Sequence, residues 1–251
     1  MSFSLFEKAC RYVEMIQFLK SRSVLFFIIL LLGIVSTPFY LSSQKKHRTL
    51  LVVGCARSGT TYISKVLKKS GLRIGHEKMG KDGISTCELT GNPKEGCWKG
   101  RWGICPENYH FAHIFHQVRD PLNVIASTYI TENLDSWYFI MNYIPEIHMQ
   151  DSHLVKCAKY WYYWNLKAEK MAEWTYRVED LDQKWEEFET RLGRKISRDS
   201  IENTPKNTNG RKTHPYEFTW EDLQNELDPE LYRNIRDLAA RYGYITGTQN
   251  P

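Results

Sequence analysis

The sequence predicts an α/β domain in which helices cover a central parallel sheet, preceded by one N-terminal transmembrane helix. Short apolar runs alternate with stretches of helical periodicity from residue 49 onward, as in parallel strands joined by crossover helices. A glycine-bounded loop joins the first of these strands to the first helix, and an uncharged apolar run precedes both. The residues from 49 to 251 are enough to bury one core, so we expect a single domain.

Residues 24–41 read VLFFIILLLGIVSTPFYL, a run long enough for a single membrane span. A cleaved signal peptide is the alternative, but the region before the run is long and Pro38 lies among the candidate cleavage positions. Lysines and arginines flank the run in similar numbers, so charge does not set its orientation. We therefore expect a cytosolic or interfacial segment at 1–23, a signal-anchor at 24–41, a short stem at 42–48 and the folded domain at 49–251.

The segment from Leu50 to Leu67 places an apolar strand, a loop bounded by glycines and an amphipathic helix in succession. Gly54 and Gly59 enclose four residues, which is the glycine spacing of a P-loop, so backbone N–H groups and the helix N-terminus can point at one anion. Thr60 stands where an ATPase loop has lysine, and the only cation of the loop is Arg57. The pattern predicts a P-loop-like, three-layer domain that holds a phosphate without that lysine.

Further elements are expected along the domain. Apolar runs predict strands at 50–54, 72–75, 114–118 and 175–178. Helical periodicity predicts helices at 60–70, 121–130, 153–173, 181–192 and 229–242. Five aromatic side chains in succession at 160–164 cannot share one face of a helix, so they either divide between the core and a binding cleft or serve packing alone.

A second strand and helix carry a second group of phosphate-binding type. Arg119 follows the strand at 114–118, Pro121 suits the first turn of the next helix, and Ser127 lies about two turns into that helix. The planar guanidinium of Arg119 suits a phosphate monoester. Arg119 and Ser127 can reach one phosphate only if the helix folds back beside the strand, and we expect that geometry in a nucleotide-binding α/β unit.

These motifs resemble those of the sulfotransferases that use 3′-phosphoadenosine 5′-phosphosulfate (PAPS) as donor. The pattern G-x-x-R-S-G-T-T resembles their 5′-phosphosulfate loop, and Arg119 with Ser127 resembles their 3′-phosphate motif. The segments 75–77 and 176–181 look like the Golgi-type and bacterial-type members, and the stretch from 219 to 244 resembles how these chains finish. The resemblance covers roughly residues 49 to 244, although Arg57 stands where many cytosolic members have lysine and the stretch from 86 to 109 matches nothing recognisable.

The resemblance implies an enzyme that moves a sulfuryl group from PAPS to a hydroxyl or amine of an acceptor such as a carbohydrate, a peptide or a small alcohol. Adenosine 3′,5′-bisphosphate is then the product, and no metal is needed because PAPS lacks a terminal polyphosphate that demands magnesium. Catalysis then depends on positioning and on charge stabilisation, with Arg57 beside the leaving phosphate. The implied donor-binding residues are Arg57, Ser58, Gly59, Thr60 and Thr61 in the loop, Arg119 and Ser127 at the 3′-phosphate, and Arg211 and Lys212 in a cationic lid.

A general base must take the proton of the acceptor hydroxyl. Glu77 follows a predicted strand whose end should lie beside the loop, and carboxylates serve as bases within hydrogen-bond reach. In the resembling tyrosyl-protein enzymes of the Golgi a glutamate at comparable spacing has this role, which favours Glu77. His76 is the competitor because imidazole titrates nearer neutral pH. His113 and His116 lie on a predicted buried strand, where we expect packing and hydrogen bonding instead of catalysis.

Composition and cysteine usage leave the setting of the protein partly open. The net charge of +5 and a pI near 8.8 fit an anionic donor, and the scattered basic residues do not indicate nucleic-acid binding. In a lumenal domain, a disulfide among Cys87, Cys97 and Cys105 would close the irregular segment between the strands. Resemblance to Golgi enzymes favours a single-pass Golgi membrane protein, attached through 24–41, with a lumenal domain; a bacterial plasma membrane is the alternative.

Two rival functions remain open at this level. A P-loop kinase or NTPase shares the loop, but the loop lacks its lysine, and Asp120 is the only candidate for an acidic magnesium ligand at a strand end. A non-catalytic, membrane-anchored nucleotide-binding protein is the second rival. The acceptor itself is not identified, although Trp98, Arg101 and Trp102 are candidates for an acceptor platform.

Overall fold

A computed structural model describes residues 45–88, 108–205 and 216–245, which belong to one compact unit, Lys45–Pro251. No helix among these described residues is long and apolar enough to cross a membrane. The expected signal-anchor at 24–41 and the segment before it lie outside the described residues, so the membrane span stays a prediction.

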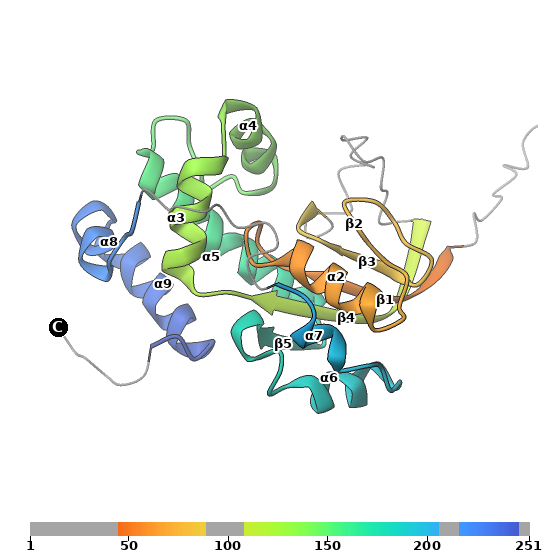
Figure 1. The fold of residues 1–251 in the computed structure, drawn as a ribbon. Helices are drawn as coiled ribbons and strands as arrows, with labels where there is room; N and C mark the ends of the chain where they lie inside the picture. Colours follow the sequence, from red (N-terminus) through yellow and green to blue (C-terminus); the bar gives the residue numbers. More distant parts are fainter. Residues whose placement is uncertain (1–44, 89–107, 206–215, 246–251) are drawn as a thin grey trace, which may run out of the picture. The chain divides into compact units, whose positions relative to one another are not determined.

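A five-stranded parallel sheet forms the centre of this unit, with strand order β2-β3-β1-β4-β5 (Figure 1). The apolar half of β1 has almost no exposed surface, because neighbouring strands flank it on both sides and helices cover both faces. The sequence therefore predicted the class of sheet correctly. The strands are β1 (Lys46–Val53), β2 (Ile74–His76), β3 (Gly83–Thr86), β4 (Tyr109–Val118) and β5 (Trp174–Arg177).

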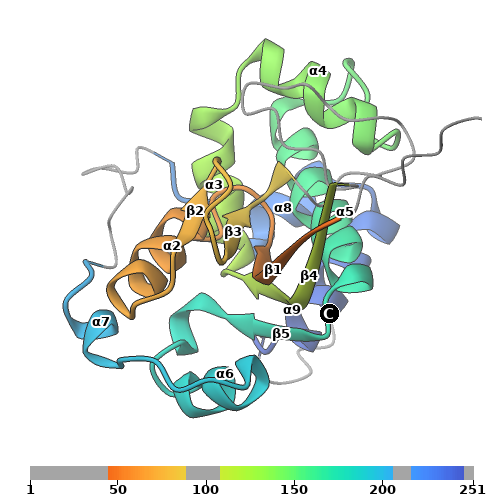
Figure 2. The same ribbon diagram turned by 90° about the vertical axis from the view of Figure 1, so that its right-hand side faces the viewer.

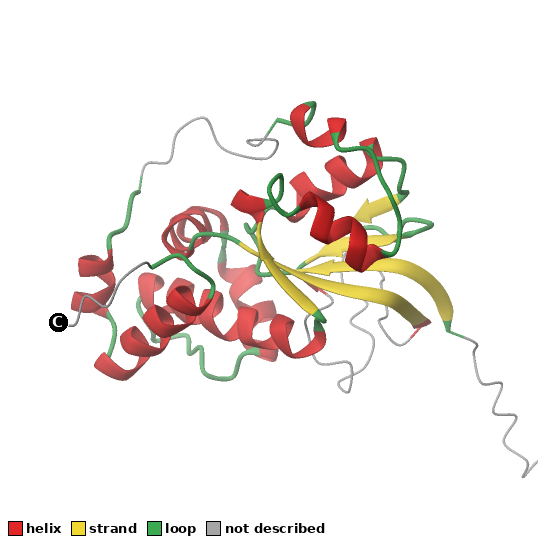
Figure 3. Ribbon diagram, turned by 90° about the horizontal axis from the view of Figure 1, so that it is seen from below, coloured by secondary structure: helices red, strands yellow, loops and turns green. Residues whose placement is uncertain are grey.

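Helices pack on both faces of the sheet, which gives three layers (Figures 2 and 3). Leu50 and Val52 of β1 face a core formed with α2 (Thr60–Lys69), α6 (Trp185–Leu192) and α7 (Asp199–Glu202). Leu51 and Val53 alternate to the opposite face, where they meet α5. The helices on that second side are α3 (Pro121–Thr131), α4 (Leu134–Tyr143), α5 (His153–Met171), α8 (Trp220–Glu226) and α9 (Pro229–Arg241).

Several elements differ from those expected. Strand β1 begins at Lys46 and not at Leu50, because residues 46–48, expected as a stem, pair with 109–111 of β4. Strand β3 was not predicted at all, since four residues beginning with glycine show no apolar pattern. Helices α4, α7 and α8 were also missed. A Cβ at Gly83 would lie 1.7 Å from the Leu50 carbonyl oxygen, so only glycine lets β3 approach β1 here.

The connection between β2 and β3 is unusually tight for parallel strands, which normally need a crossover of a dozen residues or more. Residues 77–82 double back beside β2, and the Asp82 N–H donates to the Arg73 carbonyl at 3.2 Å. A Cβ at Gly75 would lie 1.6 Å from the Lys78 carbonyl oxygen, so this return depends on glycine. Glu77 begins the loop with φ of 58°, in the left-handed region.

The aromatic run on α5 contributes mostly to the core. Tyr160, Trp161 and Trp164 are buried, whereas Tyr162 and Tyr163 are half-buried. Burial raises the Tyr163 pKa most, and the carboxylates of Glu146, Asp228 and Glu230 raise it further. This part of α5 therefore packs beside the chain around α8 and α9, and the run serves packing.

His116 is a fully buried hydrogen-bonded residue of β4, as expected. Its Nε2–H donates to the Asn165 side-chain oxygen at 3.0 Å, and its Nδ1 accepts from the Thr175 hydroxyl at 3.2 Å. Burial lowers the His116 pKa to about 4, because the charged imidazolium is poorly solvated there. His113, by contrast, is partly exposed and pairs with Glu173 at 3.0 Å.

His116 makes the stability of the fold sensitive to acid. Its pKa is lower in the folded state than in the unfolded chain, so the unfolded chain binds the extra proton as pH falls from about 6.5 toward 4. We expect this histidine alone to lower the unfolding free energy by up to about 3 kcal/mol across that window. Urea unfolding of wild type and His116→Gln at several pH values measures it, with His113→Gln as control. Parallel losses in wild type and His116→Gln would contradict the prediction.

Candidate functional site

The glycine-bounded loop leaves the end of β1 and enters α2 in the geometry expected of a phosphate cradle. A Cβ at Gly54 would lie 2.4 Å from the Gln117 carbonyl oxygen, so glycine is required where the loop passes β4. Gly59 has φ of 91° and is the N-cap of α2. Its left-handed backbone turns the chain from loop to helix at little cost, which a residue with a side chain could not do.

The N-terminus of α2 is open to an anion. Gly59 provides no capping side chain, and the first turn of α2 contains no acidic residue. Every other described helix of eight residues or more has a side-chain cap or an acidic first turn. The positive end of the α2 dipole is therefore neutralised by no carboxylate of its own first turn, which favours an external anion.

The carbonyl groups of the loop point into the protein and are bonded there. A guanidinium N–H of Arg119 donates to the Arg57 carbonyl at 3.1 Å, and the Gln117 amide donates to the Ser58 carbonyl at 2.6 Å. Because these oxygens are occupied, they do not repel an anion placed over the loop. Two backbone bonds of 3.1 Å complete the set, from the Ser58 N–H to the Cys55 carbonyl and from the Ile63 N–H to the Gly59 carbonyl.

Ser58 carries an unsatisfied hydroxyl within this loop. The residue has no exposed surface, and its Oγ has no hydrogen-bond partner among the described residues. A buried hydroxyl without a partner is costly and calls for an explanation. An oxygen of a ligand held by the loop would provide the missing partner.

Hydrogen bonds connect Arg57 with both Ser127 and Arg119 beside the loop. The sequence predicted that Arg119 and Ser127 reach one phosphate, with Arg57 beside the leaving 5′-phosphate. The Arg57 Nε–H donates to the Ser127 hydroxyl at 2.9 Å, while Arg119 donates to the Arg57 carbonyl. Helix α3 thus folds back so that Ser127, two turns along it, reaches the same place as the end of β4. Guanidinium and hydroxyl groups of this kind suit phosphate oxygens.

Asp120 does not form the Arg–Asp pair that its position next to Arg119 would allow. Its carboxylate caps α3 by accepting from the Asn123 N–H at 2.9 Å. Its own N–H donates to Glu179 at 3.0 Å. The carboxylate is therefore committed to the helix cap, which weakens its candidacy as a magnesium ligand of a kinase.

The segment 176–181 holds the loop through contacts that sequence reasoning missed. The Tyr176 hydroxyl donates to the Gln117 side-chain oxygen at 2.8 Å, and Gln117 in turn donates to Ser58. Arg177 pairs with Asp180 at 2.6 Å and donates to the Gly243 carbonyl. The segment 176–181 therefore supports the loop through Gln117. The one available signal was Gln117, a polar residue at the end of an apolar strand.

His76 and Glu77 follow β2 next to the start of α2. The His76 Nδ1–H donates to the Ser85 carbonyl at 3.0 Å, and its Nε2 accepts from the Thr61 hydroxyl at 2.9 Å. Glu77 lies 3.7 Å from that nitrogen, and its side chain is 46% exposed. Both nitrogens of His76 are thus engaged in positioning, whereas Glu77 reaches solvent beside the loop.

Backbone strain among the described residues falls on the two candidate catalytic residues. Arg57, with φ of 71°, and Glu77, with φ of 58°, are the only described residues other than glycine in the left-handed region. Such a conformation costs a side-chain-bearing residue roughly 1 to 2 kcal/mol. Strain of this kind concentrates at functional sites, because the surrounding structure holds a side chain where its chemistry needs it.

Cys55 and Tyr160 lie beneath the loop and contribute packing. Burial raises the pKa values of both groups well above their ordinary values, so the thiol and the hydroxyl stay protonated. The Tyr160 oxygen accepts from the Ala56 N–H at 3.4 Å. Cys55 therefore packs in the core below the loop.

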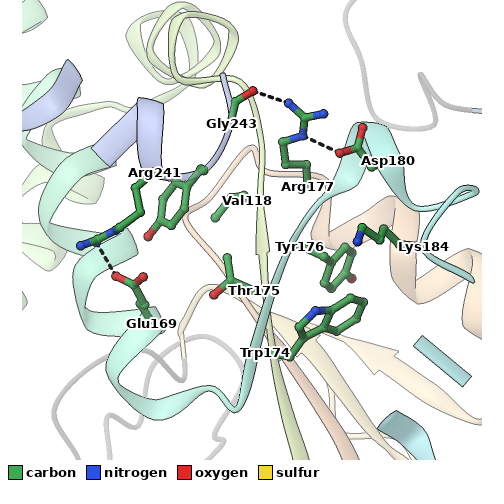
Figure 4. A pocket seen from close by; sticks show the side chains of 11 residues that line it. Val118, Glu169, Trp174, Thr175, Tyr176, Arg177, Asp180, Lys184, Arg241 and Gly243 are labelled. Carbon is green, nitrogen blue, oxygen red and sulfur yellow. Dashed lines mark hydrogen bonds and ion pairs between the residues drawn. The ribbon is translucent and has the colours of Figure 1, made fainter. Parts of the chain in front are cut away.

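A cavity of about 420 Å³ lies at the outer edge of β5 and contains none of the predicted site residues (Figure 4). Its charged groups are all paired: Arg241 with Glu169, Arg177 with Asp180, and Lys184 with Glu187 outside the cavity. It shares only the supporting segment 176–181 with the site. We therefore place the candidate site at the loop and not at this cavity.

The remaining predicted positions are not all described. Cys87 is a free thiol, whereas Cys97, Cys105 and the proposed acceptor platform lie outside the described residues. The lid residues Arg211 and Lys212 lie outside them as well. Among the residues that the structure describes, no group of three or more His, Cys, Asp or Glu side chains could hold a metal ion.

Comparison with known proteins adds no family assignment. No protein-family model, curated protein or solved structure matches this chain.

The hydrogen bonds through Gln117 predict coupling between β5 and the loop. Gln117→Met should lower the unfolding free energy by about 2 to 4 kcal/mol, because it leaves the Tyr176 hydroxyl and the Ser58 carbonyl without partners in the core. Adding Tyr176→Phe should cost less than the two single changes summed. Urea unfolding of both single variants and the double variant measures this coupling. Strict additivity would show that Tyr176 and Gln117 act independently.

Proposed function

We propose that this protein is a PAPS-dependent sulfotransferase, which moves a sulfuryl group from PAPS to a hydroxyl or amine of an acceptor. The observation that carries the proposal is the joint placement of Arg57, Arg119 and Ser127 beside an uncapped helix N-terminus. The positive φ angles of Arg57 and Glu77 support it, because both residues were assigned to catalysis from sequence. The resemblance of the motifs supplies the identity of the donor.

The described residues fit a nucleotide with separate 5′ and 3′ phosphate groups. The loop from Ser58 to Thr61 and the N-terminus of α2 would hold the 5′-phosphate, with the unsatisfied Ser58 hydroxyl as one donor. Arg119 and Ser127 would hold the 3′-phosphate. PAPS supplies the activated sulfuryl group when it is bound. Arg211 and Lys212 belong to the proposal as a cationic lid.

The chemistry assigned to this chain is positioning, charge stabilisation and one proton transfer. Arg57 and the backbone donors stabilise negative charge on the leaving 5′-phosphate, which can lower the barrier by several kcal/mol. Glu77 takes the proton of the acceptor hydroxyl as the acceptor oxygen attacks sulfur. His76 holds Thr61 and the end of β2 in register, so we assign it positioning and keep Glu77 as the base.

The rival kinase reading is less well supported. Thr61 stands where a P-loop kinase has the hydroxyl that binds magnesium, and here that hydroxyl donates to His76. Asp120 caps α3 instead of facing the loop as a free carboxylate. The loop also lacks the lysine that contacts the terminal phosphates.

For the location of the protein, we propose a Golgi membrane with the folded unit in the lumen and the membrane span at 24–41. A bacterial plasma membrane is the alternative.

Donor binding tests the proposal directly. The full-length protein should bind adenosine 3′,5′-bisphosphate at least roughly tenfold more tightly than adenosine 5′-monophosphate, since charged hydrogen bonds to the 3′-phosphate contribute. Arg119→Ala should bind both nucleotides equally, because it has lost the group that distinguishes them. Calorimetric titration measures both affinities, with exposed Arg233→Ala as the matched control. Tighter binding of Mg·ATP than of the bisphosphate would favour the kinase reading.

Glu77 should separate activity from stability. Glu77→Gln keeps the size and the strained backbone, so its unfolding free energy should equal that of wild type while sulfuryl transfer is lost. Glu77→Gly relieves the strain, so it should be as stable as wild type or more stable by up to about 1 kcal/mol, although it is equally inactive. Urea unfolding and transfer from labelled PAPS measure the two properties. Full activity of Glu77→Gln would remove Glu77 from the mechanism.

A further inference from the structure

A groove of about 720 Å³ lies against the edge strand β2 and includes His76 in its lining. Its walls come from the C-terminal end of α2, the turn before β2, and the loop 77–82. Lys68 lies seven residues beyond Thr61 on α2, which is about 10 Å at 1.5 Å per residue. Thr61 is bonded to His76, which lies next to the proposed base Glu77. The groove therefore extends about 10 Å from the base. We call it the basic groove.

Four cationic side chains line the basic groove and are exposed: Lys68, Arg73, Lys78 and Lys81. The three lysines form no ion pair with any residue that the structure describes, and Arg73 meets Asp82 only at 3.6 Å. Elsewhere on the described surface, by contrast, many cations are paired at closer range, as Lys195 is with Glu189 at 2.9 Å. Gathered like charges repel one another, and an anionic ligand would remove that repulsion.

The lining of the basic groove lacks what a neutral or aromatic ligand would need. No Phe, Tyr or Trp side chain is among its described lining residues. Leu72 and Ile74 are almost fully buried, and Met79 is only partly exposed. Aromatic rings commonly supply the contact area at recognition sites, and a peptide tyrosine would need an apolar slot. Affinity in this groove must therefore come from charge.

We propose that the basic groove binds an anionic glycan, whose carboxylate or sulfate groups contact Lys68, Arg73, Lys78 and Lys81. The inference rests on the proposed function and names its acceptor class. The bound chain presents one hydroxyl at Glu77: its oxygen forms the new O–S bond, its proton passes to the Glu77 carboxylate, and the S–O bond to the 5′-phosphate breaks. Lysines suit this task because they act as flexible point charges along a chain of separated anionic groups.

Charge reversal at two lining residues of the basic groove tests the inference on the full-length protein. The probe is a fluorescein-labelled oligosaccharide of alternating glucuronic acid and N-acetylglucosamine, read by anisotropy and used as acceptor with labelled PAPS. Lys68→Glu/Lys81→Glu should weaken its binding and raise its KM by roughly tenfold or more, with kcat little changed. The matched control, Lys170→Glu/Arg194→Glu, reverses two exposed cations elsewhere and should behave as wild type. Both should bind adenosine 3′,5′-bisphosphate as wild type does.

The two proposals fail in different ways. Normal binding of the bisphosphate with no binding or use of the anionic oligosaccharide would overturn this inference and leave the proposed function intact. Equal use of an uncharged N-acetylglucosamine oligomer, or better use of an acidic tyrosine peptide, would also overturn it. Binding of the anionic oligosaccharide that the groove variant loses, without any binding of the bisphosphate, would overturn the proposed function instead.

Discussion

The candidate site depends on one constraint: two carbonyl oxygens of the glycine-bounded loop are held by donors at the end of β4 and just beyond it. Gln117 bonds the Ser58 carbonyl, and Arg119 bonds the Arg57 carbonyl. A loop of six residues, 54–59, has few ways to satisfy these two bonds together with the left-handed turn at Gly59. Once they form, an anion over the loop meets the positive end of α2 instead of exposed carbonyl groups. Gln117 and Arg119 therefore determine which charges an anion meets at the loop.

The strain at Arg57 and Glu77 follows from the same arrangement. Arg57 lies within the short loop between β1 and α2, and Glu77 lies directly after β2 and its bonded histidine. The chain must turn sharply there, and the side chain is carried with it. Burial of Leu50–Val53 and the helices on both faces offsets a cost of roughly 1 to 2 kcal/mol at each position. Glycine would adopt the left-handed conformation at lower cost at both positions. The side chains of Arg57 and Glu77 therefore point to a functional role.

Local patterns made part of this predictable from sequence. The loop glycines, Arg119 and Ser127 could be found because strand, loop and helix succeed one another along the chain. Strand β3 could not, since its burial comes from neighbours on both sides and from a backbone contact that only Gly83 permits. The role of Gln117 was also hidden, because its partners Ser58 and Tyr176 are each 59 residues away in the sequence. Sequence thus proposed the candidate site residues and missed the groups that hold the loop.

Topology places the site independently of any motif. From β1 the chain enters α2 on one face of the sheet, whereas from the adjacent β4 it enters α3 on the other face. The two connections diverge, so a crevice opens beyond the carboxyl ends of these strands, where open α/β sheets bind their ligands. Arg57 and Arg119 meet at this point. A fold-level rule that uses no residue identity and a motif argument that uses no topology therefore select the same place, which is why we assign the donor there.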